Sequence, residues 1–326
     1  MEQDQRDLLR ISDLSVSYFI EGREILALDR VFLNLKGSND GGLGIVGESG
    51  SGKTTLGLSV LNLIELPGKI SSGAVEFEGK DVLHMSTKEL QNYRWHEVSM
   101  VYQSAMNSLN PVKTITDPIV EVLRFHSKLP RREAQQKAVE LLSEVGIKPE
   151  RANSYPHELS GGMRQRVVIA LALALTPRIM IADEPTSALD VLTQRQILSL
   201  LKKEMKQRGL YLIFITHEIS LLNGLVDNVA VMYGGEIAER GPVKKVLSNP
   251  KHPYTEMLLG TLLTLESKKE QVSLARATTR EVSHAVTPNA CKYSGRCKYA
   301  FDRCFKERPL LKQVEEGREV ACHKFN

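Results

Sequence analysis

The chain has 326 residues, of which 42% are hydrophobic, so it is long enough for about two domains with cores of their own. Its 43 basic and 39 acidic side chains are mixed along the sequence and leave a formal net charge of +4, which is too mild to indicate a nucleic-acid partner. The longest apolar run, residues 167–175, is far shorter than the roughly 20 residues that a helix needs to cross a bilayer. Composition therefore argues against an integral membrane protein and against a nucleic-acid-binding one.

The first motif in chain order is a glycine-rich loop at residues 47–54, which fits the phosphate-binding pattern G-x-x-x-x-G-K-S/T. The apolar residues 43–46 before it predict a buried strand, and residues 55–61 after it predict a helix. Backbone N–H groups and a helix N-terminus at such a loop bind phosphate oxygens. We expect Lys53 to reach the β- and γ-phosphates of a nucleotide and the Thr54 hydroxyl to ligate Mg²⁺. The predicted nucleotide contacts are Gly47, Ser49, Gly50, Ser51, Gly52, Lys53, Thr54 and Thr55.

A second predicted strand, residues 98–102, is followed by Gln103, whose neutral amide suits contact with Mg²⁺ or water. Residues 104–177 then lack strand-like runs, and residues 131–145 show the apolar spacing of a helix. We therefore predict a helical insertion between Gln103 and the next strand.

Within that insertion, Ser160-Gly161-Gly162 opens a strongly helical stretch. Ser160 is a good N-cap, and the two glycines expose backbone N–H groups, so the turn predicts a second anion site. A merely capped helix is the alternative. Two phosphate sites in one chain favour a head-to-tail dimer, in which each nucleotide contacts the glycine loop of one subunit and the Ser-Gly-Gly turn of the other.

Two apolar strands then end in polar residues. Residues 179–182 precede Asp183 and Glu184, and residues 212–216 precede His217. Ligands of open α/β sheets lie at the carboxyl ends of strands. We expect Asp183 to hold Mg²⁺, Glu184 to polarise the attacking water and His217 to contact the γ-phosphate. An acidic helix start at residues 183–186, or a structural histidine, would be the simpler interpretation of either feature alone.

Together these motifs resemble the ATP-binding subunit of an ABC transporter, and the resemblance covers nearly the whole chain. Residues 159–166 match the family signature, and residues 187–190 resemble the loop that contacts the opposite subunit. The resemblance implies roles in nucleotide binding for Tyr18, which would stack on adenine, and for Gln165 and Asp190. It also implies an α/β fold with a mainly parallel core sheet, antiparallel N-terminal strands and a helical subdomain that docks on membrane partners.

Residues 103–111, 155–158 and 249–255 are similar to segments of dipeptide and oligopeptide importers. This implies an ATPase that drives peptide uptake as a homodimer or heterodimer on separate permease chains. It would lie at the cytoplasmic face of the membrane, with an extracytoplasmic protein delivering the peptide. Import of nickel or oligosaccharides, or a soluble role such as iron–sulfur assembly, are the alternatives. The chain departs from the family in its long loop at residues 37–42 and in Ser104, where an Asp is usual.

All four cysteines, Cys291, Cys297, Cys304 and Cys322, fall near the C-terminus. With no secretory signal the chain is expected to be cytosolic, where disulfides are disfavoured and clustered cysteines more often bind metal. The gaps of five, six and seventeen residues contain no tight pair typical of zinc and match no ferredoxin spacing. We favour a 4Fe–4S cluster, to which the family tail is similar, with zinc and free thiols as alternatives.

The predicted organisation is an ATPase domain at residues 1–260, including a helical subdomain at about 104–177, then a polar linker at 261–287 and a cysteine-rich module at 288–326. We find no internal repeat, so each chain is expected to carry one ATPase unit.

Overall fold

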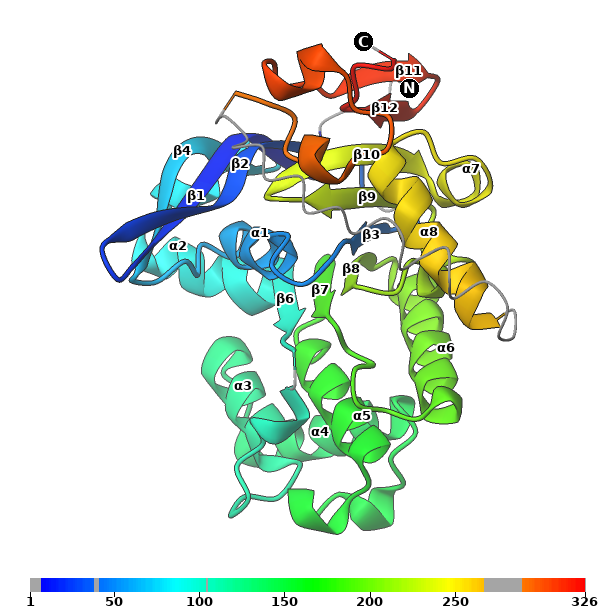
Figure 1. The fold of residues 1–326 in the computed structure, drawn as a ribbon. Coiled ribbons are helices and arrows are strands. Elements are labelled where there is room, and N and C mark those ends of the chain that lie inside the picture. The colour runs from blue at the N-terminus through cyan, green and yellow to red at the C-terminus, as the bar shows by residue number, and fades with distance from the viewer. Residues whose placement is uncertain (1–6, 38–40, 104, 267–288, 326) are drawn as a thin grey trace, which may run out of the picture. The chain divides into compact units, whose positions relative to one another are not determined.

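The computed structural model describes residues 7–37, 41–103, 105–266 and 289–325 (Figure 1). The chain folds into two compact units. The first comprises residues 1–83 and 216–326, and the second comprises residues 84–215. In sequence, therefore, the second unit is inserted into the first.

The first unit begins with an antiparallel sheet of strand order β2-β1-β4-β5. Along the second half of β2, buried and exposed side chains alternate, as expected of a strand with one face against a core. The predicted antiparallel N-terminal strands are confirmed, with bounds β1 (Leu9–Ile20), β2 (Arg23–Leu35), β4 (Gly68–Phe77) and β5 (Lys80–Asp81).

A further set of strands in this unit leads to the glycine loop. The wholly buried β3 (Leu43–Val46) pairs in parallel with β9 (Asn228–Tyr233), which pairs antiparallel with β10 (Glu236–Pro242). Gly234 and Gly235 join β9 to β10 with φ of 56° and 83°, values that a tight hairpin requires and glycine tolerates. The C-terminal strands β12 (Arg318–Val320) and β11 (Lys312–Glu315) extend the sheet from β10.

Helices surround these strands in the first unit. They are α1 (Lys53–Val60), α7 (Val243–Ser248) and α8 (Pro253–Glu266), with short 3₁₀ turns η7 (Ile219–Leu222), η9 (Ser294–Arg296) and η10 (Asp302–Phe305). A further 3₁₀ turn, η2 (Val82–His84), leads into the second unit.

The second unit contains three parallel strands, with helices before the first strand and between successive strands in the sequence. The strands β6 (Val98–Val101), β7 (Ile179–Asp183) and β8 (Tyr211–Thr216) pair in that order, and β7 and β8 are buried throughout. The helices are α2 (Thr87–Asn92), α3 (Asp117–Ser127), α4 (Arg131–Glu144), α5 (Gly161–Ala172) and α6 (Val191–Arg208). Shorter turns are η3 (Tyr93–Glu97), η4 (Ala105–Asn107), η5 (Pro149–Arg151) and η6 (Pro156–Glu158).

The predicted strands at residues 43–46, 98–102, 179–182 and 212–216 are observed within one residue of their expected bounds, because each is an almost unbroken apolar run. The helical character of the stretch between β6 and β7 is also as predicted. Ser104, residues 38–40 of the loop 37–42, and residues 267–288, which include most of the expected linker, lie outside the described residues. None of the described helices is long and apolar enough to span a membrane.

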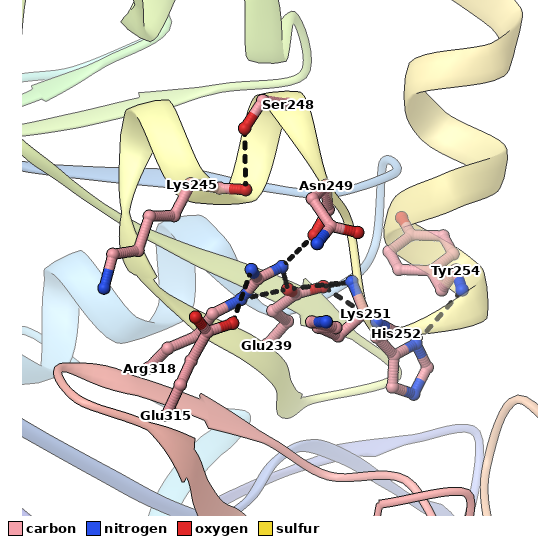
Figure 2. Close-up of polar contacts among 9 residues, drawn as sticks. All are labelled: Glu239, Lys245, Ser248, Asn249, Lys251, His252, Tyr254, Glu315 and Arg318. Carbon is pink, nitrogen blue, oxygen red and sulfur yellow. Dashed lines mark hydrogen bonds and ion pairs between the residues drawn. The ribbon is translucent and has the colours of Figure 1, made fainter.

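A buried ion pair joins the C-terminal hairpin to the sheet (Figure 2). The Arg318 guanidinium donates from Nε and Nη2 to Glu239 Oε1 at 3.0 and 2.5 Å, and the two side chains are 1% and 0% exposed. Glu239 also accepts hydrogen bonds from the backbone N–H groups of Lys251 and His252. Arg318 donates in addition to the Asn249 carbonyl oxygen. Such full hydrogen bonding is what allows a charge pair to be buried.

We predict that Arg318→Met destabilises the protein by about 3–5 kcal/mol, because it leaves the Glu239 charge buried without a cation. Arg240→Met is the matched control, since Arg240 also joins β10 to β12, through Glu319 at the adjacent register position. That pair is about a quarter exposed, at 26% and 29%, and is expected to contribute about 0–1 kcal/mol. Guanidinium chloride unfolding of both variants measures their free energies of unfolding. An equal decrease in the two variants would contradict the larger contribution of the buried pair.

Candidate nucleotide-binding site

The glycine loop in the first unit is shaped by Lys53, the first residue of α1. Lys53 is 6% exposed, and its Nζ donates to the carbonyl oxygens of Gly47 and Glu48, both at 2.8 Å. The ammonium group therefore lies within the curve of the loop, beside the N-terminus of α1. A buried cation at a helix N-terminus is suited to bind the phosphates of a nucleotide.

Two glycines of the loop are required by close backbone approach. A Cβ at Gly47 would lie 2.2 Å from the carbonyl oxygen of Met232 in β9. At Gly52, where φ is +96°, a Cβ would lie 2.4 Å from the carbonyl oxygen of Ala27 in β2. The loop thus packs against β9 and β2. This packing requires glycine at residues 47 and 52, in addition to the freedom that glycine gives the backbone to turn around a phosphate.

Tyr18 and His217, two further residues predicted to contact the nucleotide, also lie in the first unit. Tyr18 is half-buried on β1 opposite Gly68, where a Cβ would come within 2.7 Å of the tyrosine ring. His217 follows β8 with an exposed ring, and its Nε2 lies 3.8 Å from Glu218 Oε1. An exposed imidazole and a ring beside a glycine are both compatible with contact to a ligand.

In the second unit, parallel pairing brings the predicted metal and water ligands to one edge of the strands. Asp183, the last residue of β7, is 1% exposed, and Glu184 follows it with a left-handed φ of 46°. The Glu184 N–H donates to the Ile215 carbonyl oxygen of β8 at 2.9 Å. Gln103, just after β6, donates from Nε2 to Glu184 Oε2 at 3.1 Å. Carboxylate and amide oxygens at one strand edge suit Mg²⁺, and a strained backbone at Glu184 is typical of functional sites.

The Ser-Gly-Gly turn caps α5 as expected. The Ser160 hydroxyl oxygen accepts a hydrogen bond from the Met163 N–H at 3.3 Å. Gly162 lies against α6, since a Cβ there would be 2.4 Å from the Thr193 side chain, and Gly161 lies within ordinary contact distance of Leu189. The glycines therefore have a packing role as well as the proposed anion-binding one.

The remaining two residues predicted for nucleotide contact differ in exposure. Gln165 is 2% exposed within α5, while Asp190 is exposed and caps α6. Hydrogen bonds from the Thr193 backbone N–H and hydroxyl lower the pKa of Asp190. In this chain Asp190 thus has a clear structural function, which the sequence pattern did not reveal.

The four cysteines line one small cavity, together with His252 and Tyr293. The Cys291 N–H donates to the Cys304 carbonyl oxygen at 2.9 Å, which ties the two cysteine segments together. Burial raises the pKa of Cys291 to about 12. Among the described residues, no group of three or more His, Cys, Asp or Glu side chains is arranged to hold a single metal ion.

Comparison with known proteins assigns the family. Residues 33–187 match the family model described as ABC transporter, and residues 238–304 match the oligopeptide/dipeptide transporter C-terminal region. The chain is 43% identical to the oligopeptide transport ATP-binding protein OppD of Bacillus subtilis, over 96% of this chain and 87% of that protein. It is 39% identical to the dipeptide transport ATP-binding protein DppD of Escherichia coli, over 97% of this chain and 96% of the relative.

Solved structures agree with this assignment. The ATP-binding cassette MJ0796, solved as a dimer bound to ADP and Pi, matches with a TM-score of 0.63 and 31% identity, over 72% of this chain and 98% of that one. The protein cbiO1 from Clostridium perfringens matches with a TM-score of 0.63 and 28% identity, over 75% of this chain and 92% of that one. The chain therefore belongs to the ABC transporter family, as an ATP-binding protein of the oligopeptide/dipeptide type. Membership implies ATP and Mg²⁺ as its nucleotide and metal.

We predict that Gly52→Ala destabilises the nucleotide-free protein by about 1–3 kcal/mol more than Gly50→Ala does, because of overpacking. Both residues have positive φ, so both substitutions carry the same kind of backbone strain. Only Gly52 has a backbone oxygen at the Cβ position, whereas nothing lies within 4 Å of a Cβ at Gly50. Chemical unfolding without nucleotide tests this, and equal destabilisation would contradict it.

Proposed function

We propose that this chain hydrolyses ATP to drive an importer of dipeptides or oligopeptides. The observation that carries the proposal is the combination of an ABC ATPase segment with residues 238–304, which match the oligopeptide/dipeptide transporter C-terminal region. Relatives along almost the whole chain are named as oligopeptide or dipeptide transport ATP-binding proteins, which supports the same substrate class.

The proposed chemistry divides among few side chains, because phosphoryl transfer needs positioning and charge neutralisation more than covalent catalysis. The glycine loop binds the phosphates, Lys53 leaves its carbonyl partners to contact the β- and γ-phosphates, and Tyr18 stacks on adenine. Mg²⁺, which neutralises phosphate charge when bound, would be held by Thr54, Gln103 and Asp183. Glu184 accepts a proton from the attacking water, and the Gln103 amide, which donates to Glu184 Oε2, orients this carboxylate.

His217 completes the set by donating a hydrogen bond to the γ-phosphate. Its imidazole is 54% exposed, so a phosphate group of a bound nucleotide can approach it from solvent. His217 therefore acts as a sensor of the γ-phosphate rather than as the base.

The proposed assembly is a head-to-tail ATPase dimer on separate permease chains at the cytoplasmic face of a membrane. In it Ser160, Gly161, Gly162, Gln165 and Asp190 of one subunit serve the nucleotide of the other. The capped helix start at Ser160 and the solved dimer of a similar cassette support this arrangement. Homodimers and heterodimers both fit. An extracytoplasmic peptide-binding protein would deliver the substrate.

For the four cysteines we propose a 4Fe–4S cluster. Four thiolates are the usual ligands of such a cluster, and each binds a different iron atom, so the sulfur atoms stand around a shared volume. A single zinc ion instead needs its ligands gathered at about 2.3 Å from one point. Cysteines that line one cavity without forming a single-ion site favour the cluster over zinc. Bound there, the cluster would cross-link the module, which is too small to bury a large core.

Replacing the proposed base tests the motor. Glu184→Gln is expected to lower the ATPase rate by about a hundredfold or more while ATP still binds, because general-base catalysis contributes roughly 10²–10⁴-fold. Glu133→Gln, at an exposed site on α4, is the control. In cells without another peptide importer, Glu184→Gln is also expected to abolish uptake of labelled di- and tripeptides.

Unchanged turnover in the Glu184→Gln variant would contradict the assigned base. Lost turnover with unchanged peptide uptake would keep the ATPase and reject the peptide substrate, so nickel or an oligosaccharide would be tested next.

The cluster has its own test in protein purified without oxygen. We expect about four iron and four acid-labile sulfide atoms per chain, with both lost in Cys304→Ser because a cluster of this type needs its thiolate ligands. Zinc without sulfide would establish a zinc site instead. If the protein contained neither iron nor zinc, the four cysteines would be free thiols.

A further inference from the structure

Glu48, a position where the phosphate-loop motif accepts any residue, is held from three sides. Its N–H donates to the Tyr254 hydroxyl oxygen at 2.8 Å, and its carbonyl oxygen accepts from Lys53 Nζ at 2.8 Å. Its carboxylate accepts two hydrogen bonds from Arg296, at 2.8 and 3.0 Å. Tyr254 and Arg296 lie 206 and 248 residues further along the chain.

Arg296 reaches Glu48 from the turn that joins two cysteines. It ends η9, between Cys291 and Cys297, and both cysteines line the shared cavity. Backbone hydrogen bonds from Ser294 to Cys291 and from Cys297 to Ser294 close this turn at 3.0 and 3.3 Å. The position of the guanidinium is therefore set by the conformation of the cysteine module.

Tyr254 reaches Glu48 from the start of α8 and is fully buried. Its ring centroid lies 4.6 Å from that of Tyr233 and 5.5 Å from that of Tyr293. Figure 2 shows its backbone N–H, which donates to His252 Nδ1 at 3.0 Å. Because Tyr293 belongs to the cysteine module, the module also positions the Tyr254 ring, whose hydroxyl binds Glu48.

A second connection runs from the module to the other end of the loop. Lys292, next to Cys291, donates from Nζ to the Gly234 carbonyl oxygen at 2.9 Å. The adjacent Gly235 N–H donates to the Ser51 carbonyl oxygen at 3.2 Å. The module thus contacts the phosphate loop directly at Glu48 and, through the β9–β10 turn, at Ser51.

We propose that Tyr254 and Arg296 are positioning residues for the phosphate loop and that through them ATP affinity depends on the cysteine module. The Glu48 carbonyl oxygen is one of the two that accept a hydrogen bond from Lys53 Nζ. The orientation of the Glu48 peptide therefore sets the position of the ammonium group before ATP binds. A loop held in place loses less conformational entropy when ATP binds. Weakening either contact is therefore expected to lower ATP affinity and to leave the chemical step unchanged once ATP is bound.

The Arg296 contact is suited to a test because it contributes little to folding. Both side chains are partly exposed, at 49% for Arg296 and 40% for Glu48, and ion pairs this exposed contribute little to stability. A control of the same type exists in the same module, since Arg303 binds Glu307 at 2.7 Å with similar exposure.

The experiment compares Arg296→Gln, Tyr254→Phe and Arg303→Gln in the metal-replete chain, with iron and sulfide content measured for each variant. For Arg296→Gln and Tyr254→Phe we expect KM for ATP and the calorimetric Kd of ATP to rise about fivefold, while kcat changes by less than about twofold. Arg303→Gln is expected to keep the native values. Arg296→Gln combined with Glu48→Gln is expected to be no worse than Arg296→Gln alone, because both remove one interaction.

Native Kd values in Arg296→Gln and Tyr254→Phe would overturn the proposal. So would an equal rise in Arg303→Gln, since a general effect of module charge would then explain the data. A fall in kcat at unchanged KM would also overturn it, because that result assigns these residues to the chemical step. Since the readouts use ATP alone, they do not depend on the transported solute.

Discussion

The first unit is organised around the close packing of the phosphate-loop backbone on neighbouring backbone. Gly47 leaves room for the Met232 carbonyl oxygen and Gly52 for that of Ala27, so the loop contacts β9 on one side and β2 on the other. Side chains at these glycines would separate the loop from both strands. The position of Lys53, the start of α1 and the β9–β10 hairpin all follow from this contact, and the cysteine module packs in turn on that hairpin.

The cysteine module is attached to the ATPase strands by charge. Asp29 in β2 binds Lys292 and Arg308 at 2.7 Å, while Glu239 in β10 binds Arg318. Burial alone would raise the pKa of Asp29, but the hydrogen bonds from Lys292 and Arg308 hold it at about 2, so the carboxylate stays charged. Acidic residues on the ATPase strands and basic residues on the module therefore give the attachment a specific geometry.

The contacts at Glu48 have a different role from these ion pairs. The ion pairs join the module to the strands, whereas Arg296 and Tyr254 contact one residue of the loop. A module held firmly in place can transmit a small change at Cys291–Cys297 to the loop without itself dissociating.

The sequence by itself determined those features that depend on local pattern. Unbroken apolar runs specified β3, β7 and β8, caps specified the start of α5, and the spacing of Gly47, Gly52 and Lys53 specified a phosphate loop, because each reflects a rule acting over a few residues. The position of Asp183 and Glu184 at the end of a buried strand likewise followed from the apolar run before them.

Tertiary structure alone decided the contacts of residues that no local rule constrains. Glu48 occupies an unrestricted motif position, yet it binds Tyr254 and Arg296. Asp190 likewise matched a family loop while its cap on α6 went unrecognised. Pairings across more than 200 residues depend on how whole strands pack, and sequence patterns record periodicity along one segment rather than the partner that a distant segment provides.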